Sequence, residues 1–215
     1  MRKLVKLPEP QILRDKNDEW KSALSVDDSD TNKNHYNHKE IKQILYLETH
    51  DKCVYCESKI GSNCPGDIEH KIPKKKRVDL IFEWDNMTLA CTECNRRKGE
   101  YYEPDCMFLD PYNDDVENLV QHLGPIVFNL PGNKRSEVTL KTLELSSKGR
   151  AKLIDRKMER LETMRNLVER IASEKNPTLK PMLRAELDEY CSVSSEFSGM
   201  VKAYVEGLPT NWDAT

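Results

Sequence analysis

The chain has 215 residues, of which 33% are charged and 37% hydrophobic, and its formal net charge at pH 7 is -3. This length suits one domain or a small core with appended elements. No apolar run approaches the roughly 18 residues of a membrane span, and the first residues lack the apolar stretch of a signal peptide. We therefore expect a cytoplasmic protein without membrane contact. Since the chain is not basic overall, any contact with nucleic acid should be local.

Residues 1–50 are expected to form an N-terminal helical arm. Prolines and an acidic run interrupt its first part, where a short helix over residues 12–24 is possible. Apolar residues recur at helical spacing over residues 38–50, which predicts a second helix. Because that helix leads straight into the first pair of cysteines, we expect it to pack on the cysteine region.

Residues 51–110 contain most of the cysteines and are expected to form a small α+β unit. Residues 67–72 fit one strand, and residues 86–90 lead as a second strand into the second cysteine pair. Residues 78–82 fit either a continued hairpin or a loop. Residues 92–102 should form a short helix that begins at the second pair. The expected local order is therefore β, β, α.

Residues 111–215 are expected to be mixed at first and then helical. Segments 126–130 and 137–143 flank turn residues 131–134, which predicts a hairpin. From residue 146 the apolar residues follow a helical period up to Asn176-Pro177, and shorter helices are expected near 183–187 and 197–205. The apolar stripe of the long helix consists of Leu153, Ile154, Met158, Leu161, Met164, Leu167, Val168 and Ile171. The whole pattern predicts a mostly α protein with a small α+β core.

Four of the seven cysteines form two matched pairs with a Cys-x-x-Cys spacing. In a reducing compartment such pairs indicate metal ligands rather than disulfides. Four thiolates complete a tetrahedron around Zn²⁺ and leave no open position, so the site should be structural. Ordinary buried thiols and a redox motif are the alternatives, and Cys64 is close enough to replace a ligand. The predicted ligands are Cys53, Cys56, Cys91 and Cys94.

An acidic residue and a histidine, Glu69-His70, lie between the two cysteine pairs. A carboxylate binds hard cations such as Mg²⁺ or Mn²⁺ through oxygen, and a histidine that titrates near neutrality can take a proton from water. Hydrolysis of a phosphodiester needs both functions. Asp67 lies on the same strand face as Glu69 and could share or replace its role.

The pattern Cys-x-x-Cys, Glu69-His70-x-x-Pro73, Asn86 and Cys-x-x-Cys-Asn95-x-x-Lys98-Gly resembles the HNH endonucleases. The resemblance implies a ββα-metal unit that hydrolyses phosphodiester bonds of nucleic acid, with DNA expected first and RNA not excluded. It implies that His70 activates water, that Glu69 and Asn95 hold one catalytic Mg²⁺ or Mn²⁺, and that Asn86 orients the base. Asn95 stands where the family often has its last histidine, and its alternative role is a helix cap. A zinc-ribbon adaptor without catalysis, which would bind nucleic acid or an ATPase, is the alternative function.

Two basic groups flank this motif, and we expect them to contact phosphates with low sequence specificity, the alternative being a solvated loop. They comprise Lys74, Lys75, Lys76, Arg77 and Lys98. The helix before Cys53, the segment 108–111 and the helical tail resemble the HNH components of bacterial retron and Septu antiphage systems, the PtuB-like proteins. This resemblance implies a defence effector that works with a PtuA-like ATPase of the ABC/SMC type. The apolar stripe of the long helix would then be a docking surface, although an intramolecular core explains such a stripe more often.

Overall fold

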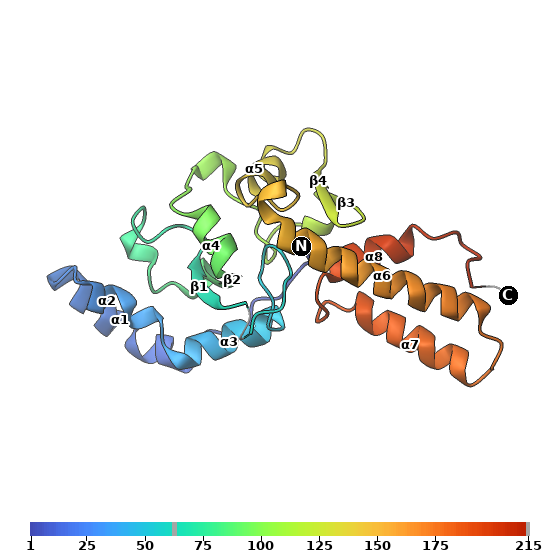
Figure 1. The fold of residues 1–215 in the computed structure, drawn as a ribbon. Coiled ribbons are helices and arrows are strands. Elements are labelled where there is room, and N and C mark those ends of the chain that lie inside the picture. Colours follow the sequence, from blue (N-terminus) through green and yellow to red (C-terminus); the bar gives the residue numbers. More distant parts are fainter. Residues whose placement is uncertain (62–63, 214–215) are drawn as a thin grey trace.

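The computed structural model describes residues 1–61 and 64–213. Figure 1 shows an elongated arrangement, with the N-terminal helices at one end, the cysteine region in the middle and the C-terminal helices at the other end. The helices are α1 (Gln11–Val26), α2 (Asp30–Lys33), α3 (Lys39–Thr49), α4 (Thr92–Lys98), α5 (Lys134–Thr142), α6 (Ala151–Ser173), α7 (Leu179–Cys191) and α8 (Ser198–Glu206). The strands are β1 (Gly66–His70), β2 (Met87–Cys91), β3 (Val120–Leu123) and β4 (Ile126–Asn129). The predicted fold class is confirmed: the chain is about half helical, with small two-stranded sheets.

The central unit consists of β1, β2 and α4, in the order expected from the sequence. The two strands pair antiparallel, with Glu69 opposite Thr88 and His70 opposite Met87. Helices α3 and α4 both pack on these strands, from either side in Figure 1, so every residue of β2 is buried. Helix α4 ends at Lys98 rather than near residue 102, because Gly99 adopts a φ of +52° that favours glycine. Residues 78–82 lie in a loop that includes a 3-10 helix (Val78–Leu80).

The hairpin predicted over residues 126–143 is wrong in its second half. Strand β4 pairs with the preceding strand β3 across a turn at Gly124, and residues 134–142 form helix α5 instead. Asn133 begins this helix by accepting a hydrogen bond from the backbone N–H of Ser136 at 2.8 Å. The residues predicted as a turn therefore lead into a helix, because Asn is favoured both in turns and at helix N-caps.

The C-terminal region is a three-helix unit built on α6, which packs against α7, while α7 packs against α8. Most of the apolar stripe on α6 is buried, so it serves as an intramolecular core as the sequence favoured. Burying one such side chain contributes about 1.5–3 kcal/mol. Met158 is the stripe residue that stays exposed, at 52%. No helix among residues 1–61 and 64–213 has the length and apolar character needed to cross a membrane. The division of the chain at residues 50 and 110 stays a prediction.

Candidate zinc and catalytic centre

The two cysteine pairs converge on one buried point. The Sγ atoms of Cys53, Cys56, Cys91 and Cys94 all lie within 4.8 Å of one another, and those of Cys56 and Cys91 are 3.8 Å apart. A tetrahedral zinc with bonds of about 2.3 Å has sulfur–sulfur edges of about 3.8 Å, so the cluster fits this metal. Because four thiolates fill the tetrahedron, the site suits a structural zinc. Cys64 lies nearby, half-buried, but is not part of the cluster.

Local backbone structure presents the four thiols. In the first pair, the N–H of Glu57 donates to the carbonyl of Cys53, and Glu57 adopts a left-handed φ of 61°. In the second pair, Cys91 is the N-cap of α4, and its Sγ accepts from the N–H of Cys94 at 3.4 Å. Arg150, which precedes α6, adds a positive charge: its Nη1 lies 3.5 Å from the Sγ of Cys94. A cation there stabilises the negative charge that four thiolates carry.

Glu69 is fully buried, and its two oxygens differ in their contacts. Its Oε1 accepts a hydrogen bond from the hydroxyl of Tyr55 at 3.2 Å and lies 2.7 Å from the Nζ of Lys98. Its Oε2 is buried without a hydrogen-bond partner in the part of the chain that the structure describes. A buried carboxylate oxygen without a donor is costly unless a cation binds it. Glu69 therefore fits the role of a ligand for a hard divalent cation.

Asn95 lies on α4 beside β1, where its Nδ2 donates to the Oδ2 of Asp67 at 3.3 Å. Both side chains are half-buried, so they are reachable from solvent. Asp67 shares its strand face with Glu69, as expected from the strand period. The structure thus brings Asn95 and the acidic face of β1 together, with Asp67 rather than Glu69 in direct contact.

His70 ends β1 and is buried, with 6% exposure. Its Nε2 lies 2.9 Å from the carbonyl oxygen of Ile81. The ring of Tyr36 packs edge-on against the imidazole at a centroid distance of 4.6 Å. Burial lowers the pKa of His70 to about 4, an effect that the hydrogen bond to Ile81 offsets only in part.

Asn86 holds the loop that carries Ile81. Its Oδ1 accepts from the N–H of Ile72 at 2.8 Å, and its Nδ2 donates to the carbonyls of Ile72 and Leu80, each at 3.1 Å. The side chain is buried, and all three contacts are to backbone. Asn86 thus ties Ile72 to Leu80, the neighbour of Ile81, while its role in orienting His70 stays a prediction.

The basic residues expected to contact phosphates are mostly bound to other side chains. Lys74 donates to the hydroxyl of Tyr36 at 2.6 Å. Lys75 pairs with Glu100, and Arg77 pairs with Asp79. Lys76 is exposed. Lys98 differs most from its expectation, because it is buried and its ammonium faces Glu69 rather than the surface.

Sequence reasoning missed the aromatic residues around the centre. Tyr36 comes from the 3-10 helix Asn34–Tyr36 of the N-terminal arm, far from His70 in the chain. Tyr55 lies inside the first cysteine pair and reaches Glu69. No spacing in the sequence links Tyr36 to the motif, because the contact depends on how the arm folds back. The position of Tyr55 between two metal ligands was the one available signal.

Comparison with known proteins shows which family the central unit resembles. Residues 53–100 match the family model described as HNH endonuclease, so the resemblance of this unit to HNH endonucleases is confirmed. The chain is also similar to two curated proteins named Septu protein PtuB. The protein from Bacillus thuringiensis is 29% identical over 82 residues, which cover 38% of this chain and 32% of the relative. The protein from Bacillus mycoides is 26% identical over 142 residues, which cover 51% of this chain and 48% of the relative. The matches therefore span less than half of either relative.

Proposed function

We propose that the chain is a metal-dependent HNH endonuclease that hydrolyses phosphodiester bonds, with DNA as the first expected substrate. The observation that carries the proposal is the placement of Glu69 and His70 at the end of β1, beside Asn95 on α4. The match of residues 53–100 to the HNH family supports the same class of activity. The proposal assigns a separate task to each of the three side chains.

His70 is the proposed general base. A carbonyl oxygen only accepts hydrogen bonds, so the contact with Ile81 requires the proton to sit on Nε2 and leaves the lone pair on Nδ1. A pKa of about 4 keeps the imidazole neutral at neutral pH. A substrate phosphate beside the ring would raise this pKa, since negative charge favours the imidazolium. Nδ1 is then the atom that takes a proton from the attacking water.

Glu69 and Asn95 are the proposed ligands of one Mg²⁺ or Mn²⁺. The orphaned Oε2 of Glu69 and the amide oxygen of Asn95 are the donor atoms, and Asp67 is placed to share the role. Oxygen donors of this kind suit hard cations. When bound, such a cation supplies positive charge for the scissile phosphate and the leaving oxygen. Lys98 and Tyr55 hold the Glu69 carboxylate in place.

The biological role follows from the relatives and is part of the proposal. Both similar proteins are named for the Septu system. We infer that this chain is likewise the nuclease of a bacterial antiphage system of the Septu or retron type, acting in the cytoplasm. Its partner in that role would be a PtuA-like ATPase. Co-purification of the chain with a PtuA-like ATPase from the same bacterium tests this part separately from the chemistry.

The experiment that tests the chemistry compares wild type with Glu69→Gln. Plasmid DNA, single-stranded DNA and RNA are each incubated with Mg²⁺, with Mn²⁺ and with chelator, in the presence and absence of the ATPase. We expect metal-dependent cleavage by wild type and a loss of cleavage in Glu69→Gln, because an amide is a weaker cation ligand than a carboxylate. Glu137→Gln, at a half-exposed acid on α5 that pairs with Lys141, is the control and should cut normally. Equal metal-dependent cleavage by Glu69→Gln and wild type would contradict the ligand assignment.

The second candidate function is a zinc-containing adaptor without catalysis. The burial of both Glu69 and His70 is the observation that favours it. An adaptor should bind nucleic acid or the ATPase equally well with and without Mg²⁺ and leave the nucleic acid intact. The same incubations therefore separate the two functions.

A further inference from the structure

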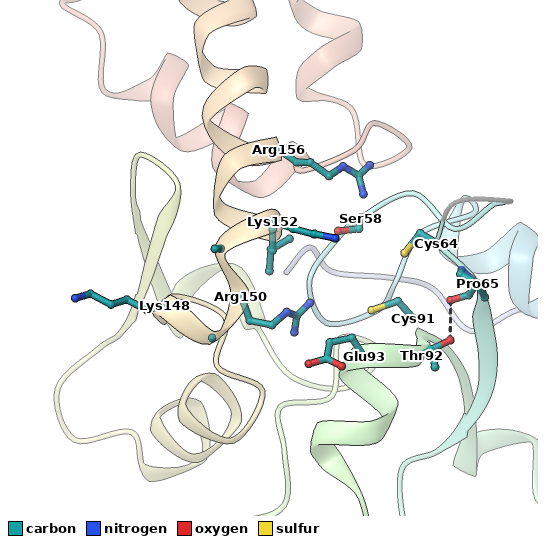
Figure 2. A pocket seen from close by; sticks show the side chains of 13 residues that line it. Ser58, Cys64, Pro65, Cys91, Thr92, Glu93, Lys148, Arg150, Lys152 and Arg156 are labelled. Carbon is teal, nitrogen blue, oxygen red and sulfur yellow. Dashed lines mark hydrogen bonds between the residues drawn. The ribbon is translucent and has the colours of Figure 1, made fainter.

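A cleft of about 600 Å³ lies beside the zinc cysteines, between the start of α6 and the start of α4. Ser58, Pro65 and Thr92 line it on the side of the cysteine unit. Figure 2 shows the side chains of Arg150, Lys152 and Arg156 pointing from the α6 side toward this unit. Lys148 also borders the cleft, but its side chain points away from the cysteines in Figure 2.

The lining of the cleft is basic. Lys152 is exposed and makes no hydrogen bond or ion pair within residues 1–61 and 64–213. Arg156 pairs with Glu196, and Arg150 points its Nη1 at the Sγ of Cys94. The one acidic residue of the lining, Glu93, already pairs with Arg96 and Arg97. A cleft with unneutralised cations favours an anionic ligand.

The cleft borders α4 and the start of β1, the elements that carry the proposed catalytic residues. Thr92 is three residues before Asn95 on α4, an axial rise of about 4.5 Å. Pro65 precedes Asp67 on the way into β1, and its carbonyl accepts from the N–H of Thr92 at 3.2 Å. A nucleic-acid strand with one phosphate at Asp67 and Asn95 would therefore place a neighbouring phosphate toward Lys152. Lys75 and Arg77 each pair with an acid, as Arg156 does, whereas Lys152 has no such partner among the described residues.

We propose that this cleft binds a backbone phosphate of the nucleic-acid strand, with Lys152 and Arg156 as its contacts. The inference rests on the proposed nuclease function and adds a substrate-binding site to it. Lysine and arginine neutralise phosphates and contact them without reading bases. The cleft would hold the strand beside the cut rather than perform chemistry.

The test measures binding in the full-length chain, in a His70→Ala background so that no strand is cut. Fluorescence anisotropy of labelled single- and double-stranded DNA gives the dissociation constant at several salt concentrations. Each phosphate contact contributes about 0.7–0.9 to the slope of log affinity against log salt. We expect Lys152→Gln to lower this slope by about that amount and to weaken binding, with recovery in Lys152→Arg. Adding Arg156→Gln to the Lys152→Gln variant should lower the slope of log affinity against log salt further.

Lys148→Gln is the matched control, because it removes the same charge from the rim but the side chain points away from the cysteines. It should leave the slope unchanged. Equal affinity and slope in Lys152→Gln and Lys148→Gln would overturn the inference, as would the absence of measurable binding at low salt. Cleavage by the otherwise wild-type chain is measured separately. Loss of binding in Lys152→Gln without any cleavage by wild type would support the cleft and count against the nuclease.

Discussion

The Nζ of Lys98 lies 2.7 Å from the Oε1 of Glu69, and both side chains are buried, with exposures of 3% and 0%. The same ammonium donates to the carbonyl of His70 at 2.8 Å. One lysine thus joins the proposed metal ligand and the backbone of the proposed base. The contact places Lys98 inside the centre beside Glu69, rather than on the surface.

Replacing Lys98 should destabilise the fold. Lys98→Met leaves the Glu69 carboxylate buried without its counter-charge, and breaking a buried pair in this way costs about 3–5 kcal/mol. Lys76→Met, at an exposed position, should change the free energy of unfolding by less than about 0.5 kcal/mol. Chemical denaturation at neutral pH without added Mg²⁺ measures both values. Equal values for the two variants would show that Lys98 does not stabilise Glu69.

The position of Lys98 shows where sequence reasoning stopped short. The pattern placed it on the short helix beside the site, and the structure agrees. The direction of the Lys98 side chain could also be predicted from the sequence. Lys98 lies four residues after the zinc ligand Cys94 and so shares the buried face of α4. The basic composition of the segment favoured a surface contact instead. In this chain, the charge next to the metal motif is a buried partner of Glu69.

Asn86 should matter for stability as well as for catalysis. Asn86→Ala removes one acceptor and two donors and leaves the half-buried N–H and carbonyl of Ile72 without partners, whereas the carbonyl of Leu80 keeps the N–H of Glu83. Each such group costs about 1–3 kcal/mol. We expect a lower melting temperature together with slower cleavage, because the loop carrying Ile81 is no longer held. Asn118→Ala, at an exposed position, should leave both unchanged. Full activity in Asn86→Ala would refute its positioning role.

The cysteine cluster gives a prediction that separates folding from catalysis. Cys94→Ser should lose bound zinc and unfold the central unit, because metal binding supplies part of the folding free energy. Cys64→Ser should keep the zinc, since Cys64 lies outside the cluster. Metal analysis and circular dichroism of the two variants check this. Retention of one zinc per chain in Cys94→Ser would contradict the assigned ligand set.

His122 on β3 should make the fold sensitive to acid. Burial, and next the charge of the amino terminus, lower its pKa to about 3, although Glu57 acts in the opposite direction and Lys157 adds to the lowering. Both of its ring nitrogens are buried without partners among the described residues. Between pH 6.5 and about pH 3, His122 is protonated in the unfolded chain but neutral in the folded chain. Stability therefore falls as the pH drops from 6.5 toward 3, by up to about 1.4 kcal/mol per pH unit for this one group.

Denaturation curves between pH 7 and pH 4 test this linkage. His122→Gln should lose stability less steeply with acid than wild type, whereas His38→Gln, at an exposed residue, should follow wild type. Apart from Glu57, which interacts with His122, the carboxylates are the same in all three proteins, so the difference reports on the His122–Glu57 pair. Parallel curves for His122→Gln and wild type would rule out a buried neutral His122.

Local signals predicted the central unit better than its surroundings. The two Cys-x-x-Cys pairs, Glu69-His70 and Asn95 set the spacing of β1, β2 and α4, and the structure brings the four cysteines into one cluster and Asn95 beside Asp67. The segment after Pro131 was misread, because Asn133 starts a helix with the same residue type that marks a turn. The packing of Tyr36 on His70 could not be predicted from the sequence, since it depends on a contact between distant segments.

The most direct test of the account is the cleavage rate of His70→Ala with Mg²⁺ or Mn²⁺, measured beside its zinc content. General-base catalysis contributes about 10²–10⁴-fold, so the rate should fall by that factor or more. The zinc content should not change, because the four cysteines lie apart from the imidazole. His38→Ala is the control and should cut like wild type. Cleavage by His70→Ala at the wild-type rate would contradict the account.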